Sequence, residues 1–331
     1  MRREDEMYMR RCLQLARCGR NESRPNPMVG AVIVADGRII GEGYHVRCGE
    51  GHAEVNAFAS VRPEDEPLLP QATIYVSLEP CSHWGKTPPC CDLIVKKGVR
   101  RVVVGCVDDF AKVQGRGIAR LREAGIEVTV GVLEEECRWL NRRFLTFHRE
   151  HRPWIVLKWA QTADGYIDDG GRALKISTPV TQRLVHKLRA EEDAIVVGRT
   201  TWEREQPQLN VRLWAGKSPE RFVLGGATAS QQGVTAVRSI DELLEACRER
   251  ELQSLIVEGG RKTLQSFLDR GLWDEMRVEE GRRLLCDGEG VSLKVEGTEK
   301  GTCAPQMPVD LEPDSVETVD GNRIAHYFRR R

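Results

Sequence analysis

Residues 73–90 read TIYVSLEPCSHWGKTPPC. The β-branched and aromatic run at the start of this stretch predicts a strand over 72–78. Pro80 follows the strand closely, and Cys90 lies where a helix over 89–97 is expected to begin. A strand that leads into a helix in this way is typical of an α/β fold.

One histidine and two cysteines around this strand form a candidate zinc site. His52, Cys81 and Cys90 offer one imidazole and two thiolates, which leaves the fourth tetrahedral position of a zinc ion open for water. Glu54 lies two residues after His52, where its carboxylate can take a proton from that water and return it to a leaving amine. A purely structural zinc site would need a fourth ligand and no such acid. We therefore predict a catalytic zinc ion with Glu54 as general acid and base.

Cys91 is a competing candidate for the third ligand position, because it adjoins Cys90. Neighbouring residues of a helix point about 100° apart. Only one of these two thiols is therefore expected to face the metal.

Strands and helices continue to alternate on both sides of this region. The first part is expected to contain a hairpin over 29–44, helices over 52–61, 89–97 and 115–124, and strands over 72–78, 100–105 and 126–130. The charged stretch 134–152 predicts a linking helix, and Pro153 marks the start of a second α/β unit. That unit is expected to contain strands over 154–160, 193–197, 221–224 and 254–257, helices over 178–190 and 240–250, and a loop or weak edge strands over 300–321. With 331 residues, we expect two domains, 1–150 and 151–331.

The overall composition argues against several classes of protein. Lysine plus arginine and aspartate plus glutamate number 50 each, so the chain carries no net charge that would favour nucleic acid. It has no run of about 18 apolar residues and no signal peptide. Eleven cysteines without an export signal favour a reducing compartment. We expect a cytoplasmic enzyme that binds neither nucleic acid nor membrane.

These motifs resemble a known family, the bifunctional riboflavin-biosynthesis deaminase/reductase of bacteria. The resemblance covers nearly the whole chain and is densest in Pro25–Ala31, Gly43–His45, Gly51–Glu54 and Leu78–Cys90. Nucleobase deaminases in general share the His-Ala-Glu and Pro-Cys elements. The long spacing from Cys81 to Cys90 is particular to this family, whereas common cytidine and transfer-RNA deaminases use a Cys-x-x-Cys pair.

The resemblance implies a fold and a reaction. It implies an N-terminal cytidine-deaminase-like α/β/α sandwich and a C-terminal dihydrofolate-reductase-like α/β domain. The family deaminates 2,5-diamino-6-ribosylamino-4(3H)-pyrimidinone 5′-phosphate and then reduces the ribosyl group to ribityl with NADPH. A small-molecule substrate and a homo-oligomer, either dimer or tetramer, are implied as well.

The family's functional residues can be carried over position by position. The zinc ligands would be His52, Cys81 and Cys90, and the proton shuttle would be Glu54. The deaminase substrate would be contacted by Asn26, His45, Asp108 and, as a candidate phosphate partner, Lys86. The reductase substrate would be contacted by Lys158, Arg189, Arg212 and Glu258, and NADPH by Thr201, Glu205, Gly259 and Gly260. The last two glycines join a strand to a helix, where a phosphate can meet free backbone N–H groups.

Departures from the family pattern are concentrated in the second half. Lys175 stands where many relatives have tryptophan in the cofactor site, Glu205 begins a triplet that replaces one with Asp, and Gly225 follows a strand that usually ends in Asp. Loss of cofactor contacts can abolish hydride transfer while the fold persists. Three alternatives therefore stay open: a deaminase with a silent reductase-like domain, a deaminase of nucleosides or RNA bases, and a zinc-stabilised binding protein without turnover.

Overall fold

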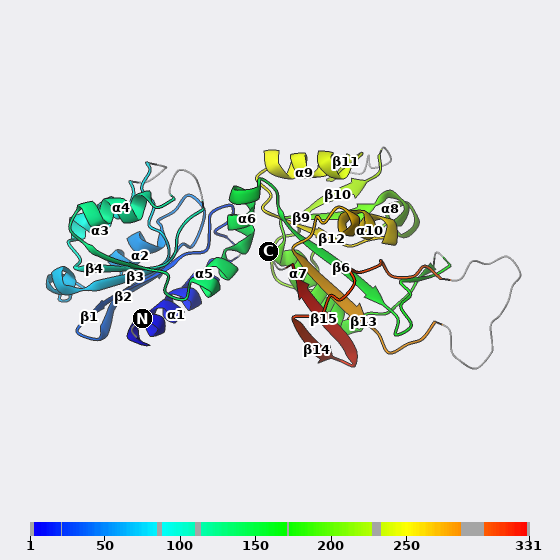
Figure 1. Ribbon diagram of the computed structural model, residues 1–331, viewed down its shortest axis with the longest axis horizontal. Helices are drawn as coiled ribbons and strands as arrows, with labels where there is room; N and C mark the ends of the chain where they lie inside the picture. Colours follow the sequence, from blue (N-terminus) through cyan, green and yellow to red (C-terminus); the bar gives the residue numbers. More distant parts are fainter. Residues whose placement is uncertain are drawn as a thin grey trace, which may run out of the picture. The chain divides into compact units, whose positions relative to one another are not determined.

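The structure is a computed structural model that describes residues 3–20, 22–84, 88–109, 114–170, 172–226, 233–285 and 301–329. The chain divides into two compact units, Met1–His151 and Arg152–Arg331 (Figure 1). Each unit has its own sheet with helices on both faces. None of the helices in the described part of the chain is long and apolar enough to cross a membrane.

The first unit is built on a five-stranded sheet in the order β2-β1-β3-β4-β5. Its strands are β1 (Gly30–Ala35), β2 (Arg38–Tyr44), β3 (Thr73–Leu78), β4 (Arg101–Cys106) and β5 (Glu127–Val130). β1 is antiparallel to β2 and β3, whereas β3, β4 and β5 are parallel. The predicted hairpin is confirmed, because Asp36 and Gly37 both have positive φ, at 51° and 71°, as a tight hairpin turn requires.

Helices cover both faces of this sheet. They are α1 (Arg3–Cys18), α2 (Ala53–Ala59), η1 (Glu66–Gln71), α3 (Cys90–Lys97), α4 (Arg116–Glu123), α5 (Glu134–Leu140) and α6 (Arg142–Glu150). Side chains alternate along β1, so Ala31 and Ile33 pack with α2 and α3 while Val32 and Val34 pack with α1 and α5. The result is the α/β/α sandwich expected for this half.

Several helical features of this unit differ from the prediction, and the short helix η1 was not predicted. No helix was predicted at 3–18, where α1 is anchored by the buried ion pair between Asp5 and Arg101. The single helix predicted over 134–152 is wrong, because α5 and α6 are separated at Asn141. The Asn141 amide accepts the backbone N–H of Met28 (2.8 Å) and donates to its carbonyl (2.9 Å), a long-range contact that local sequence does not reveal.

The second unit is built on an eight-stranded sheet in the order β11-β10-β9-β12-β6-β13-β15-β14. Its strands are β6 (Trp154–Gln161), β9 (Ala194–Gly198), β10 (Glu220–Leu224), β11 (Val234–Val237), β12 (Ser254–Val257), β13 (Glu275–Glu280), β14 (Ser315–Val319) and β15 (Asn322–Phe328). Six strands are parallel, and the β14–β15 hairpin adds an antiparallel edge. A separate small ribbon joins β7 (Asp168–Asp169) and β8 (Arg172–Ala173).

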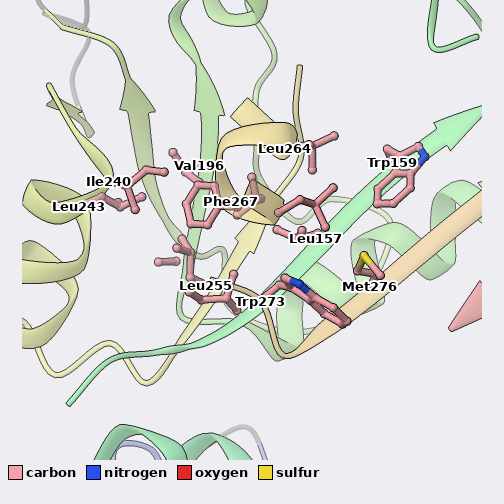
Figure 2. Close-up of a cluster of buried hydrophobic side chains, with 14 of the residues drawn as sticks. Leu157, Trp159, Val196, Ile240, Leu243, Leu255, Leu264, Phe267, Trp273 and Met276 are labelled. Carbon is pink, nitrogen blue, oxygen red and sulfur yellow. The ribbon is translucent and has the colours of Figure 1, made fainter. Parts of the chain in front are cut away.

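Four helices pack on this sheet: α7 (Pro179–Glu191), α8 (Arg199–Glu205), α9 (Ile240–Glu249) and α10 (Arg261–Asp269). Figure 2 shows the main core, to which Leu157 and Trp159 of β6 and Phe267 of α10 contribute. Because side chains alternate along a strand, Lys158 lies on the opposite face from this apolar cluster. One face of β6 therefore builds this core, while the other carries Trp154 and Val156 of a second apolar cluster and then Lys158.

Candidate active sites

The candidate metal site lies where three elements of the first unit meet. His52 is the N-cap of α2, Cys81 follows β3, and Cys90 is the first residue of α3. The Nδ1 atom of His52 is 3.5 Å from Sγ of Cys81 and 3.3 Å from Sγ of Cys90, and all three atoms lie within 4.8 Å of one another. Tetrahedral zinc with bonds of about 2.3 Å to sulfur and 2.0 Å to nitrogen holds such atoms about 3.5 Å apart. The three side chains therefore fit a zinc ion.

The local fold keeps the Cys81 sulfur ready to act as a ligand. The backbone N–H of Cys90, at the start of α3, donates to Sγ of Cys81 at 3.2 Å. A hydrogen bond from the Cys90 thiol and the neighbouring His52 lower the pKa of the Cys81 thiol against the opposing effect of burial. Metals bind the thiolate form of cysteine. Cys81 is thus the more acidic of the two thiols, while the same hydrogen bond raises the pKa of Cys90, and a metal ion bound by both sulfurs would displace the proton that they share.

Glu54 lies in the first turn of α2, beside the metal ligands. Its side chain is buried, with 3% exposed. Burial raises the pKa of the Glu54 carboxyl to about 7, and the Cys81 charge adds to that rise. A carboxyl with such a pKa can both accept and return a proton near neutral pH, which suits a general acid and base.

The structure separates the two adjacent cysteines. Cys91 is fully buried in the apolar cluster between α3 and the sheet, with Ile94 and Ala57. Burial raises the pKa of the Cys91 thiol to about 11, so it stays protonated. Cys90 belongs to the metal-binding group instead, as the angle between neighbouring helical residues allows.

Asn26 and His45 lie together next to His52. The ring of His45 meets that of His52 edge-on, with 5.4 Å between centroids. Nδ1 of His45 is 3.1 Å from the Gly51 carbonyl, and Nε2 is 3.1 Å from the Asn26 amide nitrogen. Nδ1 must therefore donate and Nε2 accept, which is the neutral imidazole, and burial lowers the pKa of His45 in agreement.

Asp108 lies at the same edge of the sheet as the metal ligands. β3 and β4 are parallel, with Leu78 opposite Cys106, so Cys81 and Asp108 both follow carboxyl ends of neighbouring strands. The Asp108 backbone N–H donates to Glu79, a residue for which no role is predicted from the sequence. Glu79 is a buried acid directly after an apolar strand, and this pattern in the sequence could have marked it as a candidate.

Lys86, the candidate phosphate partner, lies outside the described residues.

A cavity of about 360 Å³ lies at the carboxyl ends of β6, β9 and β12 in the second unit. Ligands of open parallel sheets bind at such ends. The eight residues predicted for the reductase substrate and cofactor all line it: Lys158, Arg189, Thr201, Glu205, Arg212, Glu258, Gly259 and Gly260. Lys175, one of the departures from the family pattern, lines it too.

Three further ionisable residues of the lining were not predicted from the sequence. Arg261 directly follows the Gly259-Gly260 turn, and this position next to the predicted cofactor residues could have identified it from the sequence. Asp168 and His186 also line the cavity, and no motif in the sequence marks them. They reach it because the chain between β6 and α7 and the helix α7 itself pass along its wall.

Arg189 and Glu258 form a buried ion pair in the wall of the cavity. Nε and Nη2 of Arg189 donate to the two carboxylate oxygens at 2.7 and 2.6 Å, and Nη1 donates to the Asn210 carbonyl at 3.2 Å. Burial alone would raise the pKa of Glu258, but the Arg189 charge outweighs it and the pKa is lowered. Arg212 is more exposed, and its Nη1 donates to the Asn210 side chain. Of the two arginines, Arg212 is therefore the freer to meet an anionic ligand.

The region around Gly259-Gly260 leaves backbone open to the cavity. Gly259 has φ of +114°, which other residues avoid. A Cβ on Gly260 would lie 3.0 Å from Oγ1 of Thr201, so a side chain there would crowd the space between them. These residues fit the close backbone approach that a phosphate-bearing cofactor needs.

Comparison with known proteins shows which family the two halves of the chain resemble. Residues 2–106 match the family model "Cytidine and deoxycytidylate deaminase zinc-binding region", and residues 153–307 match "RibD C-terminal domain". The riboflavin biosynthesis protein RibD of Aquifex aeolicus is 37% identical over 100% of this chain and 99% of its own length. The chain belongs to the RibD family. RibD of Escherichia coli is 35% identical over 92% of this chain and 95% of its own length.

Solved structures show the same fold over the whole length. A diaminohydroxyphosphoribosylaminopyrimidine deaminase/5-amino-6-(5-phosphoribosylamino)uracil reductase from Thermotoga maritima matches with a TM-score of 0.85, at 33% identity over 99% of both chains. RibD of Acinetobacter baumannii also matches with a TM-score of 0.85, at 28% identity over 98% of both chains. The predicted fold and family are thus confirmed. This RibD-family chain is an enzyme of riboflavin biosynthesis with deaminase and reductase functions.

Proposed function

We propose that the first domain, residues 1–150, deaminates 2,5-diamino-6-ribosylamino-4(3H)-pyrimidinone 5′-phosphate. In the same proposal, the second domain, residues 151–331, reduces the ribosyl group of the product to ribityl with NADPH. The observation that carries the proposal is the buried Glu54 beside the convergent His52, Cys81 and Cys90. A binding protein stabilised by zinc has no use for an acid and base at that place.

In the deaminase step, His52, Cys81 and Cys90 hold the metal. A zinc ion bound there supplies the acidity that makes water a nucleophile at neutral pH. Glu54 takes the proton from the attacking water and delivers it to the departing nitrogen, so water is consumed and ammonia leaves. Asn26 and His45 contact the pyrimidine and Asp108 completes its binding. Lys86 is proposed as a partner of the phosphate.

In the reductase step, residues around the cavity of the second unit orient two ligands. NADPH, when bound, supplies the hydride. Gly259, Gly260, Thr201 and Glu205 are proposed to hold the cofactor. Lys158, Arg212 and the Arg189–Glu258 pair are proposed to hold the ribosyl phosphate, with Arg212 suited to paired hydrogen bonds to phosphate. Burial lowers the pKa of Lys158, which eases loss of its proton to the substrate.

Further predictions concern the setting of the enzyme. The cysteines that the structure describes carry free thiols, which supports a reducing, cytoplasmic compartment. The homo-oligomer, dimer or tetramer, stays a prediction, as does the lack of binding to nucleic acid. Sedimentation of the purified protein checks the first of these.

A coupled assay tests the proposed function. Ammonia release from the diaminopyrimidinone ribosyl phosphate and subsequent NADPH oxidation would be recorded on the same zinc-quantified sample. Both signals in succession are the expected result. Ammonia without NADPH oxidation would instead mean that Lys175, Glu205 and Gly225 have cost the second domain its activity. Faster turnover of cytidine or transfer RNA would contradict the substrate assignment.

Removal of the metal is expected to separate the two activities. Treatment with a strong chelator should stop ammonia release, because Glu54 then has no activated water to deprotonate. NADPH oxidation with the deaminated intermediate should persist, since the described residues of the second unit contain no cluster of His, Cys, Asp or Glu side chains that could hold a metal ion. Added Zn²⁺ should restore ammonia release. Mg²⁺ should not, because it prefers oxygen ligands to thiolates.

A further inference from the structure

Glu79 lies between β3 and the metal ligand Cys81, and its side chain is buried, with 4% exposed. Both carboxylate oxygens accept backbone N–H groups. Oε2 accepts from Asp108 at 3.3 Å and from Gly115 at 2.9 Å. Oε1 accepts from Gly117 at 3.0 Å and from Ile118 at 3.3 Å. Within the described part of the chain, no lysine or arginine forms an ion pair with this carboxylate.

The four N–H groups come from the two ends of one segment. Asp108 lies just after β4, and Gly115 to Ile118 form the start of α4. Charge-assisted hydrogen bonds from backbone N–H groups stabilise a buried carboxylate, and the N-terminus of a helix favours negative charge. The Glu79 carboxylate therefore fastens both ends of the segment 107–118 to the end of β3.

Close backbone packing reinforces this attachment. A Cβ on Gly117 would lie 2.1 Å from the Pro80 carbonyl oxygen and 3.2 Å from Oε1 of Glu79. Only glycine lets the start of α4 approach the residues before Cys81 so closely. The segment that carries the metal ligand and the segment that carries Asp108 are thus held together by Glu79 on one side and Gly117 on the other.

We infer that Glu79 is a positioning residue of the deaminase, which sets the place of Asp108 relative to Cys81 and thereby the affinity for the pyrimidine substrate. Glu79 has no part in proton transfer or metal binding, since its oxygens are occupied by backbone N–H groups. The inference rests on the proposed contact between Asp108 and the substrate. It predicts an effect on substrate binding that is separate from zinc content.

Glu79→Gln is the direct test. The amide has nearly the same shape but turns an NH₂ group toward two N–H donors, so one end of the segment must move. Because a displacement of about 1 Å can cost about 10²-fold in rate, we expect kcat/KM for ammonia release to fall roughly 10- to 100-fold, mainly through KM. Bound zinc should stay at the wild-type stoichiometry. NADPH oxidation with the deaminated intermediate should not change.

Gly117→Ala provides a second variant that keeps the carboxylate. Its added methyl group pushes the start of α4 away from Pro80, so the same rise in KM is expected. Hydrogen exchange gives a measurement independent of activity: the amides of Gly115, Gly117 and Ile118 should exchange faster in Glu79→Gln while the strands of the unit stay protected. Asp65→Asn, another change of a buried acid in this unit, serves as the control and should leave KM unaltered.

The outcomes separate the inference from the proposed function. If Asp108→Asn leaves KM unchanged, the proposed substrate contact is wrong. If Asp108→Asn raises KM but neither Glu79→Gln nor Gly117→Ala does, while exchange at the start of α4 is faster, the positioning role is wrong. Loss of zinc from Glu79→Gln, with KM unchanged on re-addition, would assign Glu79 to the metal site and overturn the inference.

Discussion

Glu54→Gln is expected to lose ammonia release by roughly 10²- to 10⁴-fold in kcat while it keeps zinc and folds normally. The amide has the shape of the carboxyl group but cannot take a proton from water. The buried Glu54 carboxyl, whose pKa is raised to about 7, lowers stability as the pH rises from the unfolded carboxyl pKa of about 4.3 to about 7. Replacement by glutamine removes this cost, so the melting temperature near neutral pH should not fall. Loss of turnover would then report chemistry rather than stability.

The measurement combines steady-state ammonia release, zinc content and thermal unfolding on one preparation. Glu50→Gln is the matched control, because Glu50 is an exposed acid four residues from Glu54 and should leave all three unchanged. NADPH oxidation with the deaminated intermediate checks that the second unit is intact. Turnover of Glu54→Gln within tenfold of the wild type would assign the proton transfer to another group.

Glu258→Gln is expected to have the largest effect on the second unit. The substitution leaves the Arg189 guanidinium buried with only part of its bidentate partner, and breaking such a pair typically costs about 3–5 kcal/mol of unfolding free energy. Both residues line the cavity, so NADPH oxidation should also fall sharply. Ammonia release should persist, because the metal ligands belong to the other unit.

Denaturant unfolding, followed with a probe in the second unit, measures the loss of unfolding free energy in Glu258→Gln. Asp241→Asn is the matched control, since Asp241 pairs with Arg270 on the surface and should cost no more than about 1 kcal/mol. A double replacement, Arg189→Gln with Glu258→Gln, should cost less than the sum of the single changes because no unpaired charge remains. If the losses of unfolding free energy in the single variants simply add up in the double variant, Arg189 and Glu258 have no energetic coupling.

The pH dependence of this pair follows from its pKa. The pKa of Glu258 is lowered in the folded state, so the pair stabilises the second unit above the unfolded carboxyl pKa of about 4.3. That stability is lost as the pH falls through the lower folded value. Wild-type protein should therefore show an acid-induced loss of stability that Glu258→Gln lacks, and unfolding curves measured between about pH 3 and 6 check this.

Much of the architecture could be predicted from local patterns. The hairpin at Asp36-Gly37 follows from turn chemistry, and the strands over 72–78 and 254–257 follow from their β-branched residues. The helix α1 escaped prediction because its apolar face is interrupted by charges such as Asp5. Asp5 is buried only because Arg101, 96 residues away, provides its partner.

The sequence by itself predicted the candidate zinc site, because the three proposed ligands and Glu54 lie at strand ends and helix starts whose local signals are strong. Only the tertiary structure decided that Cys90 rather than Cys91 joins that group. It also decided that Arg189 is held by Glu258, 69 residues away, and that Glu79 gathers N–H groups from residues 29 to 39 positions further on. Such contacts depend on which strands lie side by side, and that order is set by the packing of the whole sheet rather than by any one segment.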